Sequence, residues 1–463
     1  MLPLKEEAYG TVKAYYLSAA AWFVLGTAIG LIDATHLVAP DLLGNISWLV
    51  FGRTRPMHTN LVIFGFVGTA LLGSAFYLVP TLLQTPLFSE RLGRLSLWIL
   101  NLTIAAGTIT LSLGYSQGRE YAEWIWPVDL AVLLTFTLIF YNFLRTAGRR
   151  REQTLYVSIW YIFAGLIYSF LIYFFGNAVW NPAAGAITGM PDAVLAWFYG
   201  HGVVGLYLTP LAVALAYYIV PLVCRSPLYS HSLSLFGFWT ILVIYTHIGT
   251  HHLLQTPVPT WLKVVAITGS VGMFIPVLTV LINLFLTMRG RLGLIHAEIG
   301  GKFIAAGLVW YTLVCIQGPL QSLPVIQRVT HLNNWVIAHA HMGILGFSGT
   351  MALGGIYFIL PRITGRPIYS RRWADIQYWL VLIGMAGFFM VLTAAGLIQG
   401  NGWLNGQAVY KMLPEIHVYM VLRAAIGVLI VGGAVLGLLN IYRSIYWPRG
   451  SSGPAPDRKG ETR

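Results

Sequence analysis

The amino-acid sequence predicts an all-α integral membrane protein with about twelve transmembrane helices. Of its 463 residues, 57% are hydrophobic and only 9% are charged, and the mean hydropathy is +0.72. This balance lies far outside that of soluble globular domains. Hydrophobic stretches of roughly 20 residues recur along the whole chain, and each is long enough to cross a hydrocarbon core about 30 Å thick as a helix. These observations exclude a soluble multidomain protein.

The predicted helices follow one another over almost the full length of the chain. Because their number is even, both termini are expected on the same side of the membrane. No internal repeat with a fixed period is visible, so we expect a single transmembrane domain over residues 1–450. Residues 451–463 mix Pro, Gly and charge and are predicted to form a flexible tail. The helices are expected near residues 14–34, 58–83, 95–115, 126–144, 155–175, 194–223, 233–251, 264–287, 303–323, 335–360, 378–398 and 418–442.

Basic residues predict the orientation of the bundle, because cytoplasmic loops carry an excess of Lys and Arg. With the N-terminus inside, 21 of the 28 Lys and Arg residues fall on the inner side and 7 do not. Both termini, and the tail with them, are therefore predicted to be cytoplasmic. The same asymmetry accounts for the net charge of +13. Because a clustered basic face is missing, no nucleic-acid partner is expected. The expected surroundings of the chain are a lipid bilayer.

The cysteines exclude several kinds of metal and haem site. The chain has only Cys224 and Cys315, which cannot form a disulfide framework, a CxxC zinc pair or a CxxCH haem attachment. Any metal here must therefore be bound by histidine.

Six of the twelve histidines are predicted to lie in one slab in the outer part of the membrane. They come from four separate predicted helices, the second, sixth, seventh and tenth. Ionisable groups inside a bilayer are unfavourable and usually mark function. Six imidazoles at one depth are therefore interpreted as a site rather than as unrelated packing residues. The six are His58, His201, His251, His252, His339 and His341.

The spacing of His339 and His341 predicts two metal centres on opposite sides of one helix. Residues two apart on an α-helix point about 200° from each other, so this pair cannot chelate one metal. The pair suits two haems that flank the helix. A low-spin haem needs a second axial histidine, and His58 is available, whereas the other haem keeps an open distal face.

His201, His251 and His252 are candidate ligands for a copper ion opposite that open face, since imidazole suits copper. An adjacent histidine pair on a regular helix diverges by about 100°. The pair lies at a predicted helix end, just before Pro257 and Pro259, where a distorted backbone is expected.

Five segments together resemble the haem-copper oxygen reductases, and within them the C-type branch, the cbb-type cytochrome c oxidases. The resemblance covers nearly the whole chain and implies a bundle like that of catalytic subunit I of these enzymes. The segments are FGRTRPMHTNLVIF at 51–64, REYAEWIWPVD at 119–129, WFYGHGVVGLYLTP at 197–210, IYTHIGTHHLLQTPVPTW at 244–261 and HLNNWVIAHAHMG at 331–343.

The resemblance implies a role for each candidate residue. A calcium ion that links the propionates of the two haems is also implied, and carboxylate oxygen is a suitable ligand for it. Tyr245 falls at the redox tyrosine, which is covalently joined to the histidine that His201 matches. The other matches are His58 and His341 to the axial ligands of a low-spin haem b, His339 to the ligand of a high-spin haem b, His201, His251 and His252 to the copper (CuB) ligands, Arg53 and His331 to residues near the propionates, and Glu120 to a calcium ligand.

One position departs from the pattern of the family. Where the family often has Glu in an E-G-P turn near the proximal histidine, this chain has Gln317. An amide cannot ionise, so the tuning of the high-spin haem is expected to differ.

The implied function is that of a terminal respiratory oxidase, which reduces O2 to water and couples the reaction to proton translocation. Electrons are expected from cytochrome c through the low-spin haem. Because the chain has no cytochrome c motif of its own, membrane-anchored c-type cytochrome subunits are the expected partners. The expected location is the bacterial cytoplasmic (inner) membrane.

Two other classes of function are compatible with parts of the pattern. Nitric oxide reductases share this fold and the six histidines, but they use iron in place of copper. They add a glutamate at the position of Gly205 and have no tyrosine at the position of Tyr245. A passive haem-bearing subunit or a transporter has no use for the copper histidines. The presence of Tyr245 with Gly205, and the presence of the three copper histidines, both favour oxygen reduction.

Hydroxyl groups predict one proton path that ends at Tyr245. Ser234 lies eleven residues before Tyr245, about 16 Å along a helix, and Thr209 on the neighbouring helix matches a proton-path position of the family. With ordered waters, these groups can relay a proton from the cytoplasmic side. The alternative is that each hydroxyl satisfies its own helix backbone.

Overall fold

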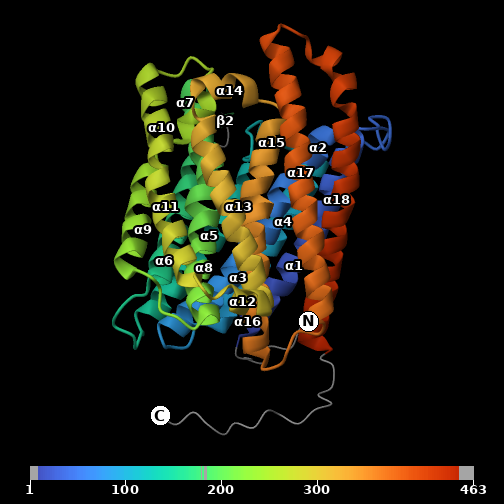
Figure 1. The fold of residues 1–463 in the computed structure, drawn as a ribbon. Helices are drawn as coiled ribbons and strands as arrows, with labels where there is room; N and C mark the ends of the chain where they lie inside the picture. The colour runs from blue at the N-terminus through green and yellow to red at the C-terminus, as the bar shows by residue number, and fades with distance from the viewer. Residues whose placement is uncertain (1–8, 179, 182–184, 448–463) are drawn as a thin grey trace.

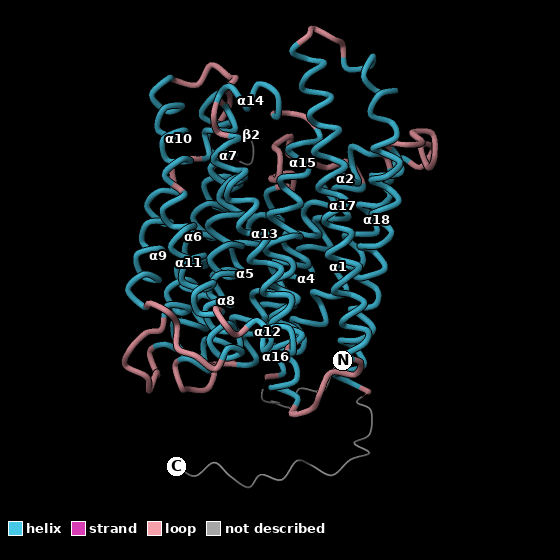
Figure 2. The backbone as a smooth tube through the Cα atoms, in the orientation of Figure 1, coloured by secondary structure: helices cyan, strands magenta, loops and turns pink. Residues whose placement is uncertain are grey.

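The computed structural model describes residues 9–178, 180–181 and 185–447, and it forms a bundle of long, roughly aligned helices (Figure 1). Twelve helical spans in this part of the chain are long and apolar enough to cross a membrane, which confirms the predicted fold class. Figure 2 shows that the loops gather mainly at the two ends of the bundle. The predicted tail, 451–463, lies outside the described residues, so the division into domain and tail stays a prediction.

Six of the spans are uninterrupted helices or nearly so, and the others are broken within the membrane or at its edge. Two short helices, α12 (Leu292–Ala297) and α14 (Pro324–Thr330), and an antiparallel pair of two-residue strands, β1 (Trp180–Asn181) and β2 (Gly185–Ala186), lie in the connections. The long helices are α1 (Gly10–His36), α2 (Phe51–Asn60), α3 (Thr69–Leu82), α4 (Glu90–Ser112), α5 (Trp126–Ala147), α6 (Val157–Tyr173), α7 (Met190–Gly202), α8 (Thr209–Cys224), α9 (His231–Tyr245), α10 (Thr260–Gly272), α11 (Phe274–Met288), α13 (Ile299–Gln321), α15 (Asn334–His341), α16 (Thr350–Thr364), α17 (Arg371–Leu404) and α18 (Val409–Tyr446).

Helix boundaries differ from the predicted ones at three places that matter for the site. The second span begins at Phe51 rather than at residue 58, because its polar first turns continue the helix beyond the apolar stretch. His58 is therefore inside the span. The last helix begins at Val409 rather than at residue 418. Helix α9 ends at Tyr245 instead of residue 251, and a separate 3₁₀ turn follows at Gly249–Leu253.

The second, sixth and tenth spans form the centre of the bundle, and all three change from α-helix to π-helix at a similar level. The most apolar windows of these spans are 94%, 94% and 89% buried, against 33 to 61% for the other nine described spans. The π-helical segment of the tenth span contacts those of the second and the sixth. π-Helical turns inside α-helices are frequently found at functional sites. The segments are Leu61–Gly68, Val203–Leu208 and Met342–Gly349.

Three helix starts share one capping arrangement. Ser89 caps α4 by accepting a hydrogen bond from the N–H of Leu92 (3.1 Å). Its backbone N–H donates to Asn142 Oδ1 (3.1 Å), and Asn142 Nδ2 donates back to its carbonyl (2.9 Å). The N–H of Phe88 donates to Thr146 Oγ1. The same pattern occurs with Ser230, Asn283 and Thr287 at α9, and with Ser370, Asn440 and Ser444 at α17.

These recurrences reveal an internal repeat, so the expectation that the chain has none was wrong. The cap serines lie 141 and 140 residues apart, and His58, His201 and His341 lie 143 and 140 residues apart. A unit of four spans therefore occurs three times, and each unit places a histidine just before its π-helical segment. The repeat is not visible in the sequence because the three units share only a few residues.

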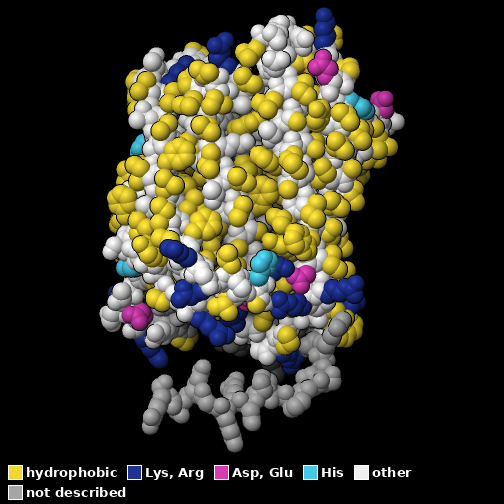
Figure 3. Space-filling model, in the orientation of Figure 1, with side chains coloured by type: hydrophobic (Ala, Val, Ile, Leu, Met, Phe, Trp, Pro, Cys, Tyr) yellow, Lys and Arg dark blue, Asp and Glu magenta, His cyan; other side chains and the backbone are white. Residues whose placement is uncertain are grey.

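The surface of the bundle fits a membrane protein. Figure 3 shows a broad band of hydrophobic side chains across the middle of the face in view. On the face in view, Lys and Arg gather mostly at the end where the described N-terminus lies (Figures 1 and 3). This distribution agrees in direction with the positive-inside rule.

Candidate functional site

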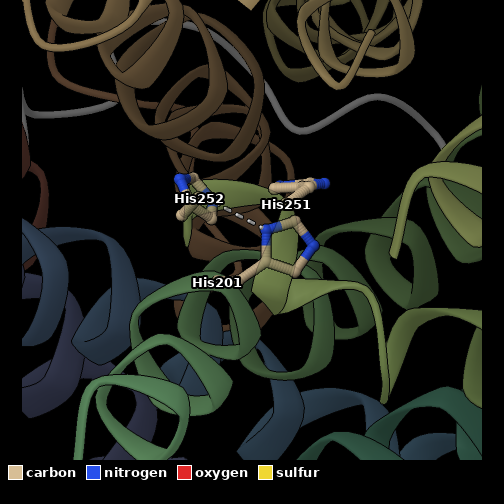
Figure 4. Close-up of side chains that lie close together, drawn as sticks. All are labelled: His201, His251 and His252. Carbon is tan, nitrogen blue, oxygen red and sulfur yellow. Dashed lines mark hydrogen bonds between the residues drawn. The ribbon is translucent and has the colours of Figure 1, made fainter. Parts of the chain in front are cut away.

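Three imidazoles from two elements converge on one point (Figure 4). His201 lies near the end of α7, while His251 and His252 lie on the 3₁₀ turn after α9. Each offers a ligand nitrogen, and these atoms all lie within 4.8 Å of one another. Nδ1 of His201 is 3.2 Å from Nε2 of His252. Two nitrogens that each bind one ion at about 2 Å lie roughly 3 Å apart, so this arrangement fits a shared metal.

The break after α9 allows two adjacent histidines to face the same point. The side chains of His251 and His252 also contact residues outside the cluster. Nδ1 of His251 is 2.7 Å from the hydroxyl of Ser270 on α10, and the ring of His252 stacks on Trp197 at a centroid distance of 3.9 Å. Partners of this kind fix ring orientation at metal sites. The turn therefore provides the distorted backbone that the sequence predicted at this helix end.

Tyr245 lies directly against the histidine cluster. Its ring stacks on the imidazole of His201, with centroids 4.3 Å apart and planes 13° apart. The phenol hydroxyl is 3.4 Å from the carbonyl of His201. The ring passes so close to Gly205 that a Cβ atom there would lie 1.8 Å from Tyr245 Cζ. No side chain at position 205 can reach the cluster while Tyr245 occupies this place.

A cavity of about 490 Å³ separates the three histidines from α15. His339 lines it from α15, and the triad and Tyr245 line it from the other side. Nδ1 of His339 is 2.9 Å from Oε1 of Gln317, an atom that can only accept, so Nδ1 carries the proton and Nε2 is free to bind a metal. The volume lies within the range of cofactor pockets. A haem held by His339 in this cavity fits the residues present.

On the other side of α15, His341 meets His58. Their ring centroids are 6.0 Å apart and their planes differ by 18°. A nitrogen binds iron at about 2 Å and lies about 1 Å from its ring centre, so two imidazoles on one iron have centroids roughly 6 Å apart. Nδ1–H of His58 donates to the carbonyl of Gly26 (2.8 Å), and that of His341 to the carbonyl of Ile337 (2.8 Å). Both Nε2 atoms are thus left for iron.

A glycine on α1 makes room for this second pair. A Cβ atom at Gly30 would lie 2.6 Å from the ring of His58. The close approach of α1 and α2 therefore depends on a missing side chain. This contact was not visible in the sequence, because the two residues are 28 positions apart.

The residues predicted near haem propionates are placed differently from one another. His331 lines the cavity, its Nδ1 has no hydrogen-bond partner, and burial lowers its pKa, which favours the neutral ring. Arg53 instead donates to the carbonyl of Ser112 (2.9 Å). Arg55, which was not singled out from the sequence, lines the cavity and forms a 2.5 Å ion pair with Glu120. The roles of Arg53 and His331 stay predictions.

Glu120 also lines the cavity. Among the described residues, the histidine triad is the only group of three or more His, Cys, Asp and Glu side chains placed to hold a metal. Calcium at Glu120 therefore stays a prediction. Nearby Glu123 is buried, and it accepts from Asn60 Nδ2 (3.1 Å) and from the N–H of Tyr121 (3.0 Å). Burial raises the pKa of Glu123, so this region holds a second carboxyl group that was not singled out from the sequence.

The two hydroxyls of the predicted proton path differ in their surroundings. Thr209 is buried and lines the cavity. The hydroxyl of Ser234 donates to the carbonyl of His231 in the first turn of its own helix (2.6 Å). Thr209 therefore lies where a relay needs it, whereas Ser234 adopts the backbone-satisfying alternative. The path stays a prediction.

Comparisons with known proteins agree with this geometry. The family model described as cytochrome C and quinol oxidase polypeptide I matches residues 10–429. The cbb3-type cytochrome c oxidase subunit CcoN1 of Stutzerimonas stutzeri is 28% identical over 449 residues, which cover 94% of this chain and 95% of that protein. A nitric oxide reductase chain of the same organism is 25% identical, over 86% of this chain and 85% of its own length. A solved haem-copper terminal oxidase dimer superposes with a TM-score of 0.79 at 17% identity, over 95% of this chain and 84% of that one.

The chain therefore belongs to the haem-copper oxidase subunit I family, whose members include the catalytic subunits of cytochrome c oxidases. It is a multi-pass membrane enzyme of the bacterial respiratory oxidases. The family implies haem and copper, and the triad of His201, His251 and His252 fits the copper site. It also implies O2 and further oxidase subunits as partners.

Proposed function

We propose that this chain is the catalytic subunit of a terminal cytochrome c oxidase of the C-type branch, which reduces O2 to water and couples the reaction to proton translocation. The observation that carries the proposal is the contact of Tyr245 with His201 and Gly205. This contact supports the proposal because a phenol stacks on a candidate copper ligand, and because its ring fills the space that a glutamate at position 205 would need.

The histidines and Tyr245 have different roles in the proposed reaction. When bound, the high-spin haem iron and copper supply three of the four electrons that O2 requires. His201, His251 and His252 hold the copper, and His339 holds the iron across the cavity. Tyr245 supplies the remaining electron together with the proton of its hydroxyl. Because Tyr245 supplies this electron and proton within the site, all four electrons would be available before any partly reduced oxygen can leave.

Electron and proton supply come from opposite directions in this proposal. His58 and His341 hold a low-spin haem b on the far side of α15, and electrons arrive there from membrane-anchored c-type cytochrome subunits. Protons come from the cytoplasmic side through Thr209 and Ser234 to Tyr245. Both termini lie in the cytoplasm, as the excess of basic residues at one end supports. Arg53, His331 and a calcium ion on Glu120 stabilise the haem propionates.

Metal analysis of the purified complex tests the proposal. We expect two haems b and one copper per copy of this chain, and O2 consumption driven by a reduced c-type cytochrome. A non-haem iron in place of copper, with consumption of nitric oxide but not of O2, would show a nitric oxide reductase. Two haems with neither copper nor iron at the triad would show a passive haem-bearing protein.

A further inference from the structure

A single buried arginine lies in the membrane interior beside the low-spin site. Arg423 is the fifteenth residue of α18 and is only 8% exposed. Among the described residues of the membrane-spanning helices, it is the only Lys or Arg that is buried. A charged group in the hydrocarbon region is strongly unfavourable unless it serves a function or finds a partner. No role for Arg423 was apparent from the sequence.

The charge of Arg423 is not neutralised by direct contact. Nε and Nη1 of Arg423 are buried without a hydrogen-bond partner, and so is Oδ2 of Asp33 on α1. Asp33 is itself only 4% exposed and is held at its other oxygen by the hydroxyl of Thr54 (2.5 Å). The two charges act on each other electrostatically but share no hydrogen bond. The positive field of Arg423 is therefore offset only in part by Asp33, and the remainder acts on its other neighbours.

One aromatic ring separates Arg423 from the nearer of the two axial histidines. Its guanidinium carbon lies 5.5 Å from the ring centroid of Phe388 on α17, and Phe388 lies 4.6 Å from the ring of His341. Arg423 is within electrostatic reach of both His58 and His341. Helix α18 packs along α1 and α17, so the arginine is fixed between the two helices that close this side of the site.

We propose that Arg423 is a positioning residue whose fixed positive charge raises the midpoint potential of the haem held by His58 and His341. Reduction by a c-type cytochrome adds one electron to the iron and lowers the net charge of the site by one. A nearby cation stabilises that reduced form, and the effect is large where the dielectric constant is low. Arg423 keeps its proton throughout. The inference rests on the proposed function, because it takes this histidine pair to hold a haem.

Redox titration of the intact complex tests the role of Arg423. Arg423→Met keeps the length of the side chain and removes the charge. We expect its low-spin haem to be reduced with an equilibrium constant at least tenfold less favourable, which is about 59 mV for a one-electron couple. Arg423→Lys keeps the charge and should retain most of the wild-type potential. The potential of the high-spin haem should change little in either variant.

Arg372→Met, on the exposed cytoplasmic start of α17, is the matched control and should leave both potentials unchanged. An unshifted low-spin potential in Arg423→Met with full haem content overturns the proposal, and so does equal behaviour of the Met and Lys variants. If Arg423→Met does not retain haem, Arg423→Gln replaces it with the same expectations. Absence of a bis-histidine haem spectrum in the unmutated complex would instead contradict the proposed function.

Discussion

The two faces of α15 hold histidines only two residues apart in very different environments. His339 faces an open cavity that it shares with the copper triad, a tyrosine and the amide of Gln317. His341 faces His58 at 6.0 Å and Phe388 at 4.6 Å, measured between ring centroids. A centre that binds a substrate needs free volume and groups that carry protons. A centre that only passes electrons needs two fixed axial ligands and a stable electrostatic environment. The predictions below test this division, from the largest effect to the smallest.

Loss of a copper ligand should affect only the cavity side. His201→Ala, His251→Ala and His252→Ala should each abolish turnover, a far larger loss than the roughly 10–100-fold caused by changes to groups that hydrogen-bond a metal ligand. The low-spin haem spectrum should stay intact, because its ligands come from other elements. His247→Ala, an exposed neighbour, is the control. Loss of the low-spin signal in all three folded variants would contradict the division.

Loss of an axial ligand should show which histidines share a haem. His58→Ala and His341→Ala should behave alike, because each removes one ligand from the same iron. His339→Ala should keep the low-spin spectrum and change the high-spin one. Optical spectra of the oxidised and reduced variants provide the measurement. A spectrum that assigns His339 and His58 to one haem would refute the opposite-face arrangement.

The amide of Gln317 should tune the cavity side alone. Gln317→Glu replaces a neutral acceptor with a carboxylate, which makes His339 a more basic ligand and should lower the high-spin potential, by roughly 59 mV for a tenfold change in the one-electron equilibrium. Gln317→Leu removes the acceptor and should shift the potential the opposite way. Separate redox titration of the two haems measures both effects. A shift confined to the low-spin haem would mean that the two faces are not independent.

The smallest effect is expected along the hydroxyl path. The double variant Thr209→Val and Ser234→Ala should slow turnover while both haems assemble and accept electrons. Because the Ser234 hydroxyl already bonds its own helix, Thr209→Val alone should account for most of the loss. Stopped-flow reduction and steady-state O2 consumption separate the two steps. Wild-type turnover in the double variant would eliminate this path.

The choice of the six histidines as candidate ligands rests on local signals. Depth along each helix and the two-residue spacing of His339 and His341 follow from sequence position and helix geometry. Gly205 and Tyr245 were identified by resemblance, but their contact was not, since it depends on how α9 packs against the π-helical segment after α7. The threefold repeat also escaped prediction, because it rests on a few caps and ligands about 140 residues apart.

By itself, the sequence determined the membrane environment, the number of spans and the types of metal ligand, since hydropathy and residue chemistry act locally. Only the tertiary structure decided which nitrogens meet, that Arg55 rather than Arg53 lines the cavity, and that Arg423 lies beside the low-spin pair. The reason is physical. The direction of a side chain depends on helix rotation, on π-helical turns and on the missing side chains that allow close packing, and these are set by contacts between segments far apart in the chain.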